Sequence, residues 1–176
     1  RNIAIGCNSF GAATTGCWNL AIGGNAMGEG VTTGNDNIAV GHNSADALTS
    51  GACNIALGLN ALGAATDNCD NIAIGQAALA ASVNDGDNNI AIGKTAMGGA
   101  DVAGANNIAI GSQALDALTS GGSNVAIGLD ALGASTTGAQ NIAIGDSALS
   151  GADTTGGDNI AFGTATMDAL TSGACN

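Results

Sequence analysis

The chain has 176 residues, 45% of them hydrophobic, which is enough to build the core of one domain. Its 30 glycines do not recur at every third position and it has no proline, so it is not a collagen. Fourteen acidic residues against two basic ones give a net charge of −12, which would repel DNA, RNA or an anionic membrane surface. We expect no nucleic-acid binding and, without an apolar run long enough to span a bilayer, no membrane insertion.

One repeat fills the whole chain. Each unit begins with an asparagine and lasts 17 or 18 residues, so we treat residues 1–176 as a single array of ten coils. Asn176 would begin an eleventh unit, and we therefore expect the array to be a fragment of a longer fibre. The ten coils start at Asn2, Asn19, Asn37, Asn54, Asn71, Asn89, Asn107, Asn124, Asn141 and Asn159.

The first element of each unit is a short strand, as in Asn71, Ile72, Ala73, Ile74 and Gly75. Large apolar residues alternate with alanine, and in an extended segment alternate side chains point to opposite faces. We expect these five residues and their equivalents in every coil to be structural. We also expect the two isoleucine columns to fill the core, and the unvarying alanine column to face a closely approaching backbone or partner, best explained by a neighbouring chain.

The second element follows two variable residues after the glycine. A small residue precedes leucine or methionine, as at Leu62, Met97, Leu115 and Leu149, which predicts a second inward-facing rung. A polar stretch then closes the unit, and its 17-residue form always carries threonine at one position. The 18-residue units gain their extra residue here, as expected for a turn on the outside of a coil.

A unit of this length is too short for a helical hairpin or a propeller blade. It fits an all-β fold, a parallel β-solenoid or β-roll, in which ten coils stacked at the strand spacing form a rod roughly 50 Å long. Stacked anchor asparagines predict a ladder of amide hydrogen bonds, and the glycine after each strand predicts a turn with positive φ.

The pattern Asn-Ile-Ala-Ile-Gly-x-x-Ala-Leu, as in residues 71–79 and 141–149, resembles the head repeats of YadA-type trimeric autotransporter adhesins. It is also similar to repeats of phage tail fibres. The resemblance implies a left-handed parallel β-roll that associates side by side as a homotrimer, with each coil contributing a short strand to the trimer. The unit here is longer than that of the adhesins and begins with asparagine.

Four of the five cysteines gather at one corner of the repeat, and Cys7 instead follows a glycine. Cys53 and Cys69 lie on consecutive coils in nearly the same column, which predicts Cα atoms about 5–6 Å apart, within reach of a disulfide. A cross-link in an oxidising exterior is one interpretation, and free thiols acting as small hydrophobic groups are the other.

Neither catalysis nor a cofactor is expected. The array repeats near-identical surfaces, and its one histidine, His42, has no recurring partner, so we expect no enzyme. Asp and Asn clusters at residues 35–37, 68–71 and 84–89 suggest calcium, but solvated turns are the simpler interpretation, since the carboxylates do not recur at fixed columns. Asp46, Asp116 and Asp168 share a column but lie three or four coils apart.

The function expected from these features is structural. We expect a shaft or head segment of an extracellular trimeric fibre used for attachment, either a phage tail fibre or a bacterial surface adhesin. A host-surface receptor or glycan would be bound through regions outside residues 1–176. Two alternatives remain: a self-assembling homopolymeric surface filament, and an ice-binding solenoid that uses its aligned threonines.

Overall fold

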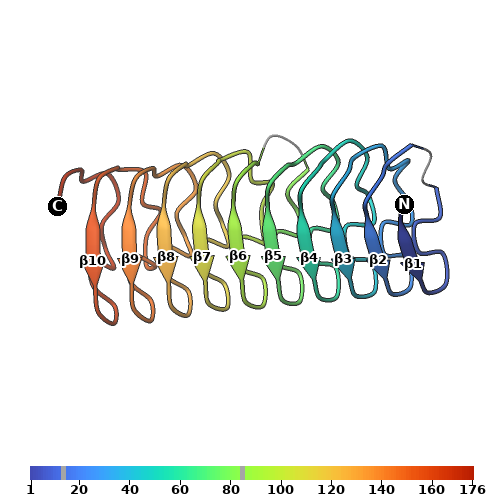
Figure 1. Ribbon diagram of the computed structural model, residues 1–176. Coiled ribbons are helices and arrows are strands. Elements are labelled where there is room, and N and C mark those ends of the chain that lie inside the picture. The colour runs from blue at the N-terminus through green and yellow to red at the C-terminus, as the bar shows by residue number, and fades with distance from the viewer. Residues whose placement is uncertain (13–14, 84–85) are drawn as a thin grey trace.

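The computed structural model describes residues 1–12, 15–83 and 86–176 and consists of ten three-residue strands joined by turns (Figure 1). Each strand follows an anchor asparagine directly, so the numbering of the strands is also that of the coils. The strands are β1 (Ile3–Ile5), β2 (Leu20–Ile22), β3 (Ile38–Val40), β4 (Ile55–Leu57), β5 (Ile72–Ile74), β6 (Ile90–Ile92), β7 (Ile108–Ile110), β8 (Val125–Ile127), β9 (Ile142–Ile144) and β10 (Ile160–Phe162).

The strands form one parallel sheet in the order of the sequence, from β1 to β10. Equivalent residues of neighbouring coils pair directly, so that Ala73 of β5 lies opposite Ala91 of β6. This confirms the all-β parallel solenoid. In the part of the chain that the structure describes, no helix is long and apolar enough to cross a membrane.

The expected orientation of the strand is wrong. The alanine column points into the coil, where Ala39, Ala73 and Ala109 are fully buried, and the isoleucine columns point outward. The coil is narrow, so a strand side chain that points inward immediately meets the second rung and the opposite backbone. Only a methyl group fits there, which explains the constant alanine without a neighbouring chain.

The predicted second rung is confirmed and supplies most of the core volume. Leu62, Leu79, Met97, Leu115 and Leu132 are fully buried and pack against the alanine column. Because the interior is closed by these residues, each coil buries its own apolar contents against the coils above and below it.

The anchor asparagines form the predicted ladder along the buried edge of the sheet. The backbone N–H of Asn71 donates to Oδ1 of Asn54 at 3.0 Å, and the backbone N–H of Asn89 donates to Oδ1 of Asn71 at 2.8 Å. The Nδ2 group of Asn71 donates across the coil to the carbonyl oxygen of Gly86 at 2.7 Å. One asparagine therefore ties its coil to both neighbours and closes it on the opposite side.

The glycine after each strand has the predicted positive φ, which is 135° at Gly75 and 138° at Gly93. A Cβ atom on Gly75 would also overlap the carbonyl oxygen of Gly93 in the next coil. Glycine is thus required twice at this corner, by its backbone conformation and by the close approach of the neighbouring coil.

Three further columns have positive φ without glycine, which the sequence did not suggest. In coil 4 they contain Asn60, Leu62 and Asp70, with φ values of 55°, 53° and 59°. Asparagine and aspartate tolerate this region, but leucine rarely enters it. The buried leucine is held there by its packing in the core, so core packing outweighs local preference at this turn.

The coils also repeat in blocks of four. The block from Asn19 to Asn88 has coils of 18, 17, 17 and 18 residues, and the block from Asn89 to Asp158 has the same lengths in the same order. Within the blocks, Asp46 to Gly51 recurs as Asp116 to Gly121. The turn that begins at Asp46 therefore reappears four coils along the rod.

Candidate functional site

The outward face of the sheet is an apolar stripe that runs the length of the rod, and we call it the isoleucine face. It consists of the first and third residues of all ten strands, and every one of these is Ile, Leu, Val or Phe. The side chains of Ile38 and Ile110 are each 37% exposed, although neighbours in the stack cover them on two sides. No other segment among the described residues covers this face.

The size of the isoleucine face sets it apart from ordinary surface. Ten strands at about 4.8 Å spacing and two side chains per strand make a stripe roughly 45 Å long and 13 Å wide, or about 600 Å². That area equals the largest apolar patches found on typical monomers, which are often functional. Two such faces in contact would remove about 1,200 Å² from water, the lower end of the range for stable protein interfaces.

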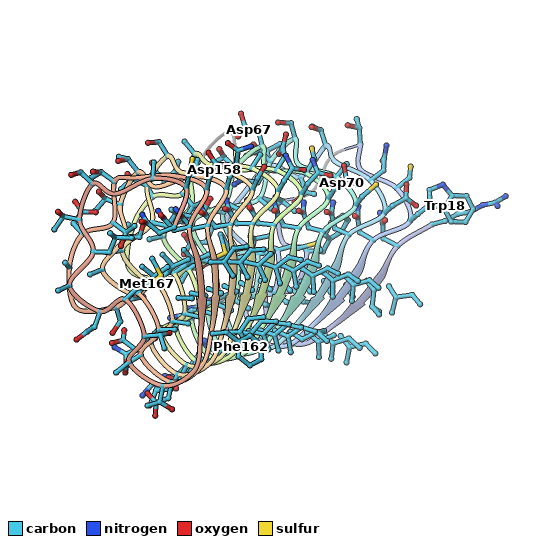
Figure 2. The ribbon with its side chains drawn as sticks, turned by 90° about the vertical axis from the view of Figure 1, so that its left-hand side faces the viewer. Trp18, Asp67, Asp70, Asp158, Phe162 and Met167 are labelled. Atoms are coloured by element: carbon cyan, nitrogen blue, oxygen red, sulfur yellow. The ribbon has the colours of Figure 1, made fainter. Side chains whose placement is uncertain are left out.

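Acidic residues lie along one edge of the rod. Asp67, Asp70 and Asp158 lie along the upper ridge in Figure 2, whereas Phe162 lies on the strand side at the lower edge. The rod is therefore amphipathic across its width. Charge on the ridge keeps that side in water, and the isoleucine face is the side suited to burial.

The cysteine corner lies at the end of each coil, next to the anchor asparagine. All five cysteines are free thiols in this structure, and Cys53 is exposed while Cys69 is partly covered. The backbone N–H of Ala52 donates to Sγ of Cys69 at 3.4 Å, so the two cysteines lie on adjoining coils, as predicted from their columns. A disulfide between them stays a prediction.

The column of Asp46, Asp116 and Asp168 is positioned at the turn after the second rung. Burial raises the pKa of Asp116, and the carboxylate of Asp130 raises it further, while the backbone N–H groups of Gly99 and Gly98 lower it. Oδ1 of Asp116 is buried and accepts no hydrogen bond. The sequence shows that the three aspartates share a column. It does not show that Oδ1 of Asp116 is buried, because this burial arises from the previous coil lying over the carboxylate.

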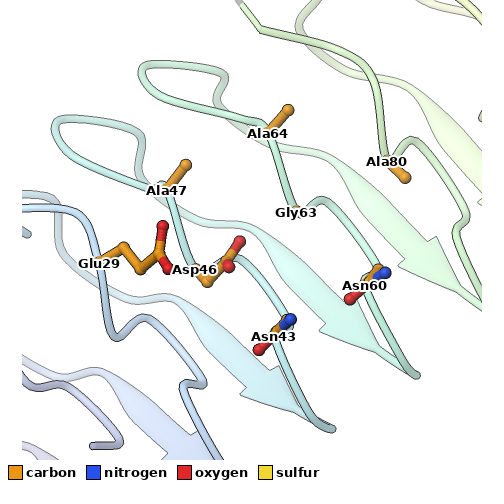
Figure 3. A pocket seen from close by; sticks show the side chains of 8 residues that line it. All are labelled: Glu29, Asn43, Asp46, Ala47, Asn60, Gly63, Ala64 and Ala80. Carbon is orange, nitrogen blue, oxygen red and sulfur yellow. The ribbon is translucent and has the colours of Figure 1, made fainter.

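A shallow depression of about 360 Å³ lies beside this column (Figure 3). The carboxylates of Glu29 and Asp46 and the amides of Asn43 and Asn60 are among the groups that line it. Burial raises the pKa of Asp46, and the nearby carboxylate of Glu29 raises it further. Within the described ranges no group of three or more His, Cys, Asp or Glu side chains is placed to hold a metal ion.

The aligned threonines direct their hydroxyl groups along the stack. The hydroxyl of Thr49 donates to the carbonyl oxygen of Thr66 at 2.8 Å, and that of Thr119 donates to the carbonyl oxygen of Thr136 at 3.0 Å. Each of these hydroxyls therefore links one coil to the next. Thr14 of this column, and Asn84 and Asp85 of the third acidic cluster, lie outside the described residues.

Comparison with known proteins adds no relative: no protein-family model, no curated protein and no solved structure matches this chain.

Proposed function

We propose that this chain is a structural segment of an extracellular homotrimeric fibre used for attachment, on a phage tail or a bacterial surface. The observation that carries the proposal is the uncovered isoleucine face along all ten coils. Exposed apolar surface of this length favours association, and a straight stripe on a rod is matched best by the same stripe on a parallel copy.

In the proposed assembly, three rods lie side by side with their isoleucine faces toward a shared axis. The acidic ridges then point outward, where like charges are separated and hydrated. The array itself acts as a stiff spacer, since each coil is bonded to its neighbours along the whole length.

The role of ice binding is disfavoured by the threonine geometry. An ice-binding array needs hydroxyls presented to solvent in a regular plane, whereas Thr49, Thr66 and Thr119 donate theirs to backbone carbonyls of the next coil. The fibre proposal uses the isoleucine face, which the ice hypothesis leaves unexplained.

The test is the mass of residues 1–176 in solution, measured by light scattering after size exclusion across a range of concentrations. We expect three times the chain mass, constant with concentration. A triple substitution of Ile92, Ile110 and Ile127 to threonine keeps β-branched residues but makes the face polar, and should give monomers with an unchanged circular dichroism spectrum.

The matched control is Thr137→Lys, at an exposed position in the outer turn, which should leave the trimer intact. A wild-type chain that stays monomeric at all concentrations contradicts the proposal. A mass that grows without limit as the concentration rises would instead favour the open-ended filament.

A further inference from the structure

We propose that Cys53 and Cys69 form a reversible disulfide that clasps coil 3 to coil 4. The two residues occupy neighbouring columns of adjoining coils: Ala52 and Cys53 end coil 3, and Cys69 and Asp70 end coil 4. The backbone N–H of Asp70 donates to the carbonyl oxygen of Ala52 at 3.0 Å, which fixes the register of the two ends. Cys69 therefore lies diagonally above Cys53.

The separation of the two Cα atoms lies within the range of a disulfide. Coils are spaced by about 4.8 Å and successive Cα atoms by about 3.8 Å, so the diagonal between the two Cα atoms is roughly 6 Å. Disulfides join Cα atoms about 4.4–6.8 Å apart. Both thiols are reachable from solvent, since Cys53 is exposed and Cys69 is only partly covered.

The side chain of Cys69 already points back toward coil 3. Its sulfur accepts the backbone N–H of Ala52, the residue directly before Cys53. The same column uses side-chain oxygens in other coils, where Asn35 accepts the N–H of Cys17 and Asp87 accepts that of Cys69, both at 2.7 Å. The backward direction is thus a property of the column, and in coil 4 it carries a thiol.

The groups around Cys53 affect which of the two thiols attacks an oxidant first. Loss of solvent around the sulfur raises the pKa of Cys53, and the carboxylates of Asp70 and Asp36 and the neighbouring Cys69 raise it further. Because thiolates are the attacking species, Cys53 reacts slowly with an oxidant.

The oxidant is a small-molecule disulfide such as oxidised glutathione. The Cys69 thiolate attacks one sulfur of it, forming a mixed disulfide and releasing one glutathione thiolate. Cys53 then loses its proton to water and attacks the Cys69 sulfur, which releases the second glutathione thiolate and completes the protein disulfide. Two protein thiols are oxidised and one glutathione disulfide is reduced, and excess thiol reverses both steps.

The other cysteines provide internal controls. Among the described residues, which include all five cysteines, Cys7 and Cys17 belong to coil 1 and Cys175 to coil 10, and the coils next to these contain no cysteine. A disulfide between two adjoining coils can therefore form only between Cys53 and Cys69. It does not depend on the proposed trimer, because both sulfurs belong to one chain.

The experiment equilibrates the intact chain in a glutathione redox buffer and maps disulfides by digestion before aspartate. Cleavage at Asp46, Asp67 and Asp70 separates residues 46–66 from residues 67–69, so the clasp joins these two peptides. We expect this linked pair, a loss of two titratable thiols, and a higher melting temperature that reductant reverses.

The variant Cys53→Ser should lose the linked peptide and the reductant-sensitive part of the melting temperature, while Cys17→Ser should retain both. Serine is accepted in this column, where Ser123 adopts the same positive φ in coil 7. The proposal would be overturned by disulfides between chains, by a different cysteine pairing, or by thiols that stay free in a folded chain. It would also be overturned if the Cys53–Cys69 disulfide formed faster in urea, where the chain is unfolded, than in buffer.

Discussion

At the scale of single residues, the fold covers polar groups that would ordinarily be in water. Asp116 shows this most clearly, because its carboxylate is covered by the preceding coil and one oxygen accepts no hydrogen bond. A buried carboxylate favours its neutral form, so the pKa of Asp116 is higher in the folded chain than in the unfolded one. The charge at this position costs stability at neutral pH.

The first prediction concerns this carboxylate. A raised folded pKa gives a stabilisation that is fully present below the unfolded pKa of 3.8 and is lost as pH rises through the folded value. Asp116→Asn, which is neutral at every pH, should therefore be more stable than wild type at pH 7 by roughly a few tenths of a kcal/mol, because the carboxylate is only partly buried and solvent screens its charge. The difference should shrink as pH falls toward 4.

Urea denaturation followed by circular dichroism at pH 4 and pH 7 measures this difference. Asp101→Asn, at an exposed carboxylate in the outer turn of coil 6, serves as a comparison. A gain for Asp116→Asn that is equal at both pH values would show that burial of the charge is not the cause.

At the scale of the element, one coil is held by a short strand, a buried rung and one asparagine. Asn107 illustrates the third part: its Oδ1 accepts the backbone N–H of Asn124 at 2.9 Å, and its Nδ2 donates to the carbonyl oxygen of Gly121 at 3.0 Å. Both contacts are buried. An amide at this position therefore satisfies backbone groups that water cannot reach.

The second prediction is that Asn107→Ala destabilises the fold by roughly 3 kcal/mol. The change leaves the N–H of Asn124 and the carbonyl of Gly121 buried without partners, and each such group costs about 1–3 kcal/mol. Thermal melting and hydrogen exchange should place the loss in coils 7 and 8. Its neighbour Asn106 gives the control: Asn106→Ser should change the free energy of unfolding little, since Ser123 occupies the same column with similar φ.

At the scale of the whole molecule, the rod is a one-dimensional array. Each strand from β2 to β9 contacts the strands before and after it, and stability is approximately a sum over coils and their junctions. The four-coil blocks, Asn19 to Asn88 and Asn89 to Asp158, end at equivalent points of the repeat. A block can therefore be added without shifting the register of the coils after it.

The third prediction is that inserting a second copy of residues 89–158 after Asp158 lengthens the rod by about 19 Å, four coils at the strand spacing. Small-angle scattering of the folded chain should show this increase in maximum dimension with an unchanged cross-section. An insert that stops half a coil early breaks the asparagine ladder and should lower the melting temperature. An increase in cross-section with no increase in length would contradict the linear array.

The repeat, the strand and its alternation, the second rung, the glycine corner and the parallel stack could all be predicted from the sequence. These features depend on local periodicity, which is fully contained in residues such as Asn71 to Gly75. The side of the strand that faces inward could not be obtained in this way, because alternation distinguishes two faces without saying which one is enclosed.

The face of each strand that points into the coil depends on the width of the coil, which is a property of the tertiary structure. The turns bring the second rung so close to the strand that only alanine fits between them, which excludes the isoleucines from the core and leaves them on the surface. The same closeness buries one carboxylate oxygen of Asp116, holds Leu62 in a left-handed conformation and sets Cys69 diagonally above Cys53. Each of these depends on the distance between segments that are far apart in the chain.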